Sequence, residues 1–124
     1  MRTAGDSHDR EIGVAFLSAY AGKMEALMAL LRQGQVKAKI DKARVSEMYR
    51  ALKSTLKEDY RRLSRRESQG EATHIEAAFL LPAVHQASTR LRPATNTNPS
   101  TSDWFGAVYS ARIDVLHFLI ELKK

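Results

Sequence analysis

Basic side chains are concentrated in one stretch of the chain, and their spacing suits contacts with phosphate or carboxylate groups. Residues 37–66 hold eleven lysines and arginines against four acids, a net charge of +7, whereas the whole chain carries +6. The remaining residues are therefore slightly acidic taken together. A charge this localised predicts an acidic partner on one face of the molecule, not a generally basic surface.

Part of this charge falls on one side of a predicted helix, beside its apolar stripe. We call these residues the basic strip: Arg50, Lys53, Lys57 and Arg61, extended by Arg65 and Arg66. A phosphate backbone needs only lysine and arginine at the right reach, and an acidic protein helix can use the same charges. A solvated face that serves solubility is the simpler alternative. No aromatic residue interleaves the strip, so a platform for stacked bases is not expected.

Most enzyme classes find no support in the sequence. The chain has no cysteine, which excludes disulfides, thiol catalysis and cysteine-ligated metals. It also has no glycine-rich phosphate loop, no nucleophile elbow and no serine–histidine–carboxylate pattern. Glu71 to His74 and Asp114 to His117 have the carboxylate-x-x-histidine spacing of di-iron bundles, but a helix that begins at Thr73 leaves Glu71 outside it. We therefore expect no metal and no cofactor, and we favour a non-enzymatic binding module.

Arg112 and His117 are separated by four residues on a predicted helix. This spacing resembles the arginine–histidine signature of HEPN domains, small helical bundles that often act as dimeric, metal-independent ribonucleases. The resemblance covers a short stretch, and Ile113 stands where that family usually has a polar residue. It implies that His117 is the general acid–base and that Arg112 stabilises a phosphorane-like state. The alternatives are an exposed His117 and a structural or interface role for Arg112, with Asp59 as a conceivable partner.

Residues 44–51 are similar to the opening of LYR-motif proteins, small basic helical mitochondrial factors that hold an acidic acyl carrier protein. Met48 replaces the leucine of that motif, before Tyr49 and Arg50. The resemblance implies an acidic protein partner. Core positions for Met48 and Tyr49, with Arg50 at the surface, explain the same residues.

Helical periodicity dominates the chain, and no convincing strand pair appears. The first helix is expected over about residues 9–32, with Gly34 at its C-terminal end, and its wide apolar surface predicts the most buried helix. The second is expected over about residues 41–66. Its apolar stripe is expected to face the core and consists of Val45, Met48, Tyr49, Leu52, Leu56, Tyr60 and Leu63.

The second half of the chain predicts two further helices. Thr73 and Glu76 fit a capping box that starts the third helix, and Pro82 is expected to kink or break it. Residues 93–102 lack large apolar side chains and are expected to form a flexible polar loop, before a fourth helix over about residues 103–122. The sequence therefore predicts an all-α, antiparallel up-and-down four-helix bundle, one domain spanning residues 1–124.

The sequence also suggests where the protein works. Residues 1–10 lack the apolar core of a signal peptide, and runs such as 115–120 are too short to span a bilayer. We expect a soluble, cytoplasmic protein without membrane insertion. A homodimer stays possible, and a homo-oligomeric structural protein held together by Trp104, Phe105 and Tyr109 is a further alternative.

Overall fold

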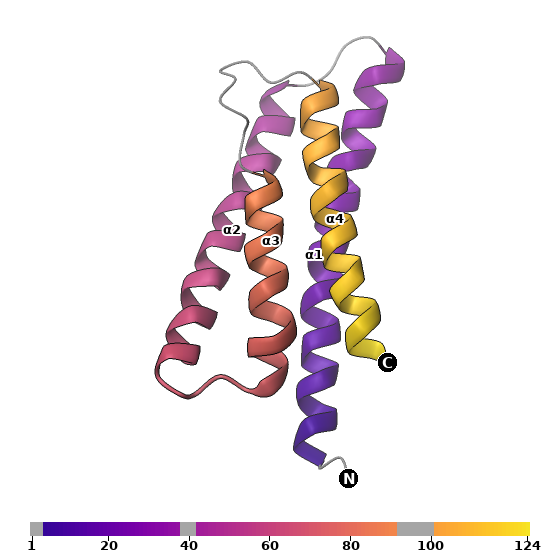
Figure 1. Cartoon of the computed structure of the whole chain (residues 1–124). Helices are drawn as coiled ribbons and strands as arrows, with labels where there is room; N and C mark the ends of the chain where they lie inside the picture. The colour runs from indigo at the N-terminus through magenta and orange to yellow at the C-terminus, as the bar shows by residue number, and fades with distance from the viewer. Residues whose placement is uncertain (1–3, 38–41, 92–100) are drawn as a thin grey trace.

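The chain folds into four helices that run alternately up and down (Figure 1). The computed structural model describes residues 4–37, 42–91 and 101–124, and these residues contain helices and no strand. The elements are α1 (Ala4–Lys37), α2 (Lys42–Ser68), a π-helical turn η1 (Glu76–Leu80), α3 (Leu81–Leu91) and α4 (Thr101–Lys123). The predicted all-α antiparallel four-helix bundle is confirmed.

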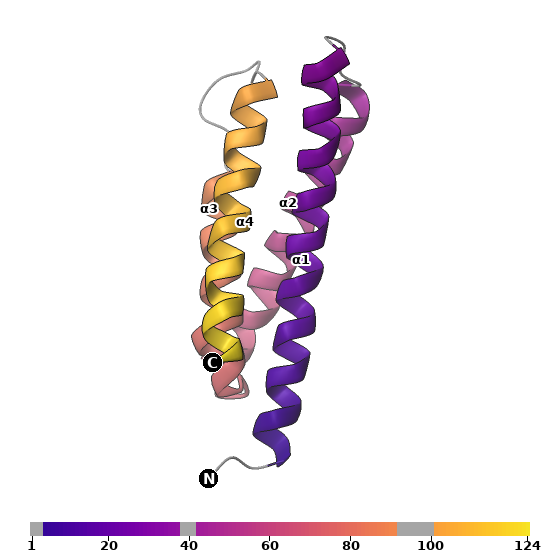
Figure 2. The ribbon, with the colours of Figure 1, turned by 90° about the vertical axis from the view of Figure 1, so that its right-hand side faces the viewer.

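The helices form a ring with one weakly packed side. α1 packs most extensively on α4, α4 also packs on α3, and α3 packs on α2. α1 and α2 have the least contact of the four neighbouring helix pairs, although they are consecutive in the chain. Figure 2 looks onto the layer made by α1 and α4, with α2 and α3 behind it.

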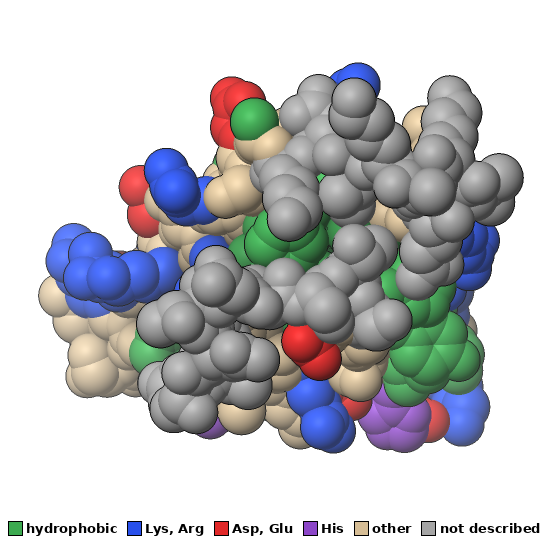
Figure 3. Space-filling model, turned by 90° about the horizontal axis from the view of Figure 1, so that it is seen from above, with side chains coloured by type: hydrophobic (Ala, Val, Ile, Leu, Met, Phe, Trp, Pro, Cys, Tyr) green, Lys and Arg blue, Asp and Glu red, His purple; other side chains and the backbone are tan. Residues whose placement is uncertain are grey.

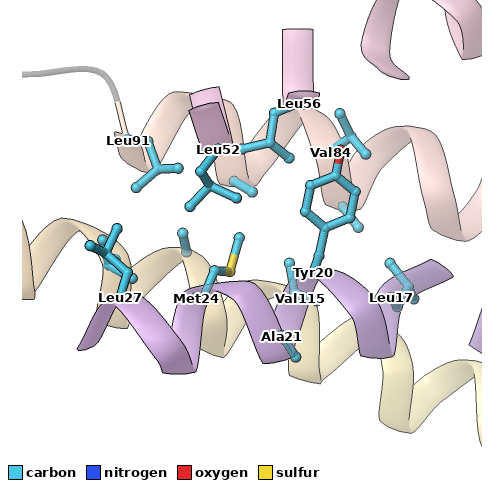
Figure 4. Packing of buried hydrophobic residues seen from close by; sticks show 14 of the residues in the cluster. Leu17, Tyr20, Ala21, Met24, Leu27, Leu52, Leu56, Val84, Leu91 and Val115 are labelled. Carbon is cyan, nitrogen blue, oxygen red and sulfur yellow. The ribbon is translucent and has the colours of Figure 1, made fainter. Parts of the chain in front are cut away.

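The core is apolar and draws on all four helices. Figure 4 shows these side chains converging, with Tyr20 of α1 reaching across towards α2 and α3. Each fully buried aliphatic side chain contributes about 1.5–3 kcal/mol relative to an exposed one. The largest fully buried side chains are Leu17, Met24, Leu27, Leu31, Val45, Leu56, Leu63, Val84, Leu91, Val108, Val115 and Leu122.

The predicted core stripe of α2 is confirmed with one exception. Five of its seven residues are buried and Met48 is half-buried, but Tyr60 is 39% exposed. The prediction for Tyr60 is wrong because this residue lies at the edge of the stripe, where α3 covers it only in part.

The ends of the first two helices differ in how they are fixed. α1 continues through Gly34 to Lys37, so the predicted end at Gly34 is wrong. α2 ends at Ser68, and the turn that follows contains Gly70, whose φ of 72° is in the left-handed region that favours glycine. The Glu71 N–H donates to the Arg66 carbonyl at 2.8 Å and the Gly70 N–H to the Glu67 carbonyl at 3.1 Å. These two bonds form a Schellman motif that satisfies the last carbonyls of α2.

The third helix begins with the predicted capping box. The Glu76 N–H donates to Thr73 Oγ1 at 3.1 Å, and the Thr73 N–H donates to Glu76 Oε1 at 3.0 Å. The π-helical turn η1 follows, in which the Leu81 N–H donates to the Glu76 carbonyl. The kink expected at Pro82 stays a prediction. Of the predicted polar loop over 93–102, all but the last two residues lie outside the described part of the chain.

Candidate functional site

The outward face of α2 carries four cations that make no ion pair with any described residue. These side chains are all exposed, and they are Arg50, Lys57, Arg61 and Arg65. Figure 3, a view onto the loop end, shows lysine and arginine side chains gathered on the side of the molecule where α2 lies in Figure 1. The rise of the helix separates Arg50 from Arg65 by about 22 Å, at 1.5 Å per residue. This length matches about six phosphates of one strand at about 3.4 Å each.

Lys53, also part of the basic strip, has an intramolecular contact. It is half-buried, and its ammonium group lies 5.9 Å from the centre of the Tyr49 ring. This contact is a cation–π interaction with the ring of a buried tyrosine. Lys53 therefore lies at the edge of the basic strip, where α2 approaches α3, and is less available to a partner than the four exposed cations.

Arg66 is held by the connection between α2 and η1. Its Nη2 lies 2.9 Å from Glu76 Oε1 and its Nε lies 3.0 Å from Glu76 Oε2, while Nη2 also donates to the Glu71 carbonyl at 3.0 Å. Burial alone would raise the pKa of Glu76, but hydrogen bonds from Arg66 and Thr73 outweigh it and lower that pKa. Arg66 thus fixes the turn after α2, and fewer of its donors remain for a partner.

An exposed aromatic pair lies beside the basic strip. Tyr60 of α2 and His85 of α3 have ring centres 5.5 Å apart and ring planes 32° apart. Tyr60 follows Lys57 by three residues, so the two side chains are neighbours on the helix surface. The sequence did not reveal this feature, because the periodicity predicted a buried Tyr60. Its place at the edge of the apolar stripe was the only signal.

Arg112 and His117 lie on different sides of α4. Arg112 turns towards α1, where its Nη2 lies 3.8 Å from Glu25 Oε2. The suggested pairing with Asp59 is wrong, because Asp59 accepts a hydrogen bond from the Tyr20 hydroxyl. His117 is exposed, with its ring 5.8 Å from that of Phe118. Five residues correspond to about 140° around a helix, so the two side chains point in different directions within one chain. The HEPN-like pairing of Arg112 and His117 stays a prediction.

An apolar groove separates α1 from α2 on the weakly packed side of the bundle. Its volume is about 250 Å³, and its lining includes no carboxylate or histidine among the described residues. It can accept an apolar side chain, and it offers no acid–base pair. The described segments also contain no group of three histidines or carboxylates close enough to hold a metal ion. The groove is lined by Lys23, Ala26, Leu27, Met48, Ala51, Leu52 and Thr55.

No protein-family model, curated protein or solved structure matches this chain. Its function is therefore inferred from the chemistry of its surfaces. Fold class alone does not decide it, because four-helix bundles serve many unrelated functions.

Proposed function

We propose that the protein is a non-enzymatic binding module whose α2 surface engages the phosphate backbone of a single-stranded nucleic acid. The observation that carries this proposal is the row of exposed cations at Arg50, Lys57, Arg61 and Arg65, which have no carboxylate partner among the described residues. Exposed arginine and lysine need no further chemistry to contact phosphates.

The exposed Tyr60–His85 pair favours a single strand over a duplex. Unpaired bases stack on aromatic side chains, and each stacked base contributes about 1–3 kcal/mol of binding free energy. Tyr60 stands next to Lys57 on the helix surface, so one nucleotide can place its phosphate on the lysine and its base on the ring. A duplex hides its base faces and would use only the cations.

The same surface offers little to a folded acidic protein. Among the described residues, Tyr60 is the only large apolar side chain exposed on α2. Stable protein interfaces bury an apolar centre inside a polar rim, and this face lacks such a centre. An acidic protein partner is therefore the weaker alternative. A soluble, cytoplasmic protein, as the sequence suggests, suits a nucleic-acid ligand.

Binding of labelled single-stranded RNA, measured as a function of salt, tests the proposal. The triple variant Arg50→Gln, Lys57→Gln, Arg61→Gln should bind more weakly at low salt. Its plot of log K against log salt should be shallower by about 2, because each phosphate contact on a single strand contributes about 0.7 to the slope. Tyr60→Ala should weaken binding by about 1–3 kcal/mol and leave the slope unchanged.

A variant with the same loss of charge elsewhere serves as the control. Lys23→Gln, Lys123→Gln, Lys124→Gln removes three positive charges from α1 and the C-terminal end. It should keep the wild-type salt slope. Equal slopes for the two triple variants would show that the α2 surface does not bind the strand. RNA cleavage without metal that disappears in His117→Ala would replace the binding proposal by a HEPN-like ribonuclease.

A further inference from the structure

A row of large apolar side chains is exposed on α4. Tyr109 and Ile113 are each 45% exposed and Ile120 is 58% exposed. Their spacing of four and seven residues places them on one line along the helix. Figure 3 shows hydrophobic side chains at the surface on the side where α1 and α4 lie in Figure 1. Large apolar side chains that gather on one exposed face often mark an interaction surface.

The outward face of α1, next to this row, is apolar but consists of small residues. A segment of 18 residues within Ser7–Gln33 has a mean hydropathy of 1.4, yet only 39% of it is buried in the fold. A Cβ added at Gly22 would meet no atom within 4 Å. We call these exposed residues the α1 stripe: Ala15, Ala19, Gly22, Ala26 and Ala29. The surface formed by α1 and α4 therefore combines a helix with small exposed side chains and a helix with large ones.

We propose that this face binds a second copy of the chain in a symmetric dimer, with α4 of each subunit packed on the α1 stripe of the other. α1 and α4 are antiparallel neighbours (Figure 2). A two-fold axis that runs parallel to the helices, between the α1–α4 layer of one subunit and that of the other, therefore places α1 opposite the partner's α4 at the same height. The large side chains then meet the small ones, which lets the two backbones approach closely.

The charges on this face are complementary under the same symmetry. Glu25 of α1 and Arg112 of α4 stand at the same height, with Nη2 and Oε2 3.8 Å apart. The two-fold axis brings Glu25 opposite Arg112 of the partner subunit. The Glu25 side chain is 70% exposed, so it can accept from a second guanidinium. Arg112 is 28% exposed, and its terminal Nη2, which already lies near Glu25 of its own chain, is the group that faces this surface.

The size of the face suits a dimer. From Glu11 to Arg32 the helix is about 31 Å long, and two helices side by side are about 20 Å wide. The projected area is about 600 Å², close to the roughly 800 Å² that each partner of a standard interface buries.

A membrane is the competing occupant, and the charges on α1 oppose it. Lys23 and Glu25 flank the α1 stripe at the middle of its length, where a lipid-facing helix would carry them into the hydrocarbon. In a protein interface the same residues form an ordinary polar rim.

Sedimentation equilibrium of the full chain tests the dimer. The wild-type protein should have a mass near twice 13.9 kDa. The double variant Ile113→Glu, Ile120→Glu and the single variant Gly22→Leu should sediment as monomers with unchanged helical circular dichroism, because all three positions are exposed. Gln86→Glu, an exposed change on α3, should remain a dimer. A wild-type monomer at every concentration would overturn the proposal, as would dimers formed equally by all variants.

Two single-cysteine variants test the symmetry, since the natural chain contains no cysteine. An oxidised mixture of Ala26→Cys chains and Ile113→Cys chains should form mainly the mixed disulfide. If Ala26→Cys chains cross-linked mainly to each other instead, α1 would face α1 of the partner subunit, and the proposed two-fold axis parallel to the helices would be wrong. A wild-type monomer that sediments with phosphatidylcholine vesicles would assign the face to a lipid surface and overturn the dimer.

Discussion

At the scale of single residues, Tyr20 joins α1 to α2, the neighbouring helix pair with the least contact. Its hydroxyl, on α1, donates to the carboxylate of Asp59 on α2. Burial raises the pKa of Tyr20, and the hydrogen bond to Asp59 raises it further. Tyr20→Phe should therefore lower the free energy of unfolding by about 1.5–3 kcal/mol, the usual contribution of a hydrogen bond to a charged group. Urea denaturation measures this loss.

Tyr60→Phe is the matched control, because Tyr60 is exposed and its hydroxyl makes no hydrogen bond with a described residue. Its effect should stay within about 0.5 kcal/mol. Equal losses in the two variants would show that the bond to Asp59 contributes nothing measurable.

Tyr49 gives the fold a dependence on alkaline pH. Its hydroxyl donates to the Leu91 carbonyl at 2.5 Å, and burial raises the pKa of Tyr49 to about 12. Because the pKa of Tyr49 is raised in the folded state, its protonated hydroxyl contributes to the free energy of unfolding. This contribution is complete below the unfolded pKa of about 10 and is lost as the pH rises towards 12.

The comparison of wild type with Tyr49→Phe across this range tests the prediction. The variant should be less stable at neutral pH, because the Leu91 carbonyl loses its donor. The difference should shrink above pH 10 by at most about 3 kcal/mol, at about 1.4 kcal/mol per pKa unit. A difference that stays constant up to pH 12 would contradict the prediction.

Residue-scale features were only partly predictable from the sequence. Helical periodicity identified which residues of α2 share a face, but it did not show how much of that face α3 covers. Tyr60 was therefore predicted to be buried although it is exposed. The partner of Arg112 depends on the register between helices, which local periodicity does not contain. The register that the bundle adopts gives Asp59 to Tyr20 and Glu25 to Arg112.

At the scale of the helices, a glycine sets how closely α1 approaches its neighbours. A Cβ at Gly13 would lie 2.8 Å from Ile75 Cγ2 and 2.9 Å from Leu122 Cδ2. Gly13→Ala should destabilise the fold by about 1–2 kcal/mol, because overpacking exceeds the gain in helix propensity. Gly106→Ala, where a Cβ meets nothing within 4 Å, should instead stabilise it by up to about 1 kcal/mol. Thermal unfolding that shifts in the same direction for both variants would contradict this packing.

The start of the third helix depends on Thr73. Its hydroxyl oxygen accepts from the Glu76 N–H, which satisfies a donor at the helix N-terminus. Thr73→Ala should cost about 1 kcal/mol of stability, whereas Thr73→Ser should retain most of it. Chemical denaturation of the two variants measures the difference. Equal destabilisation by serine and alanine would locate the effect in the lost methyl group instead.

The helix ends show why some local predictions succeed. The capping box depends only on the four consecutive residues from Thr73 to Glu76, so it could be predicted from the sequence. The π-helical turn before Pro82 and the passage of α1 through Gly34 have no comparable short sequence pattern. A glycine ends a helix only where the chain turns. The presence of Gly34 in the sequence does not specify where the chain turns, so it did not mark the end of α1.

At the scale of the whole molecule, the apolar character of α1 predicted the most buried helix. One side of α1 is buried, with Leu17, Met24, Leu27 and Leu31 in the core, but its small residues face outwards. Hydropathy measures a preference for leaving water, and it does not say whether the same chain, a second chain or a lipid provides the cover. The bundle was therefore predictable, and the outward face of α1 was not.

The groove between α1 and α2 has room for a larger side chain at its edge. Ala51 is exposed at its edge, above Leu27 and Leu52, in a space of about 250 Å³. Ala51→Leu should fill part of this space and raise the free energy of unfolding by about 1–2 kcal/mol, since each buried methylene contributes about 0.8 kcal/mol. Ser54→Leu, also exposed on α2 but outside the lining, should give no gain in urea denaturation. A loss of stability in Ala51→Leu would contradict the prediction, because it would mean that α1 and α2 pack too closely at this groove to admit a larger side chain.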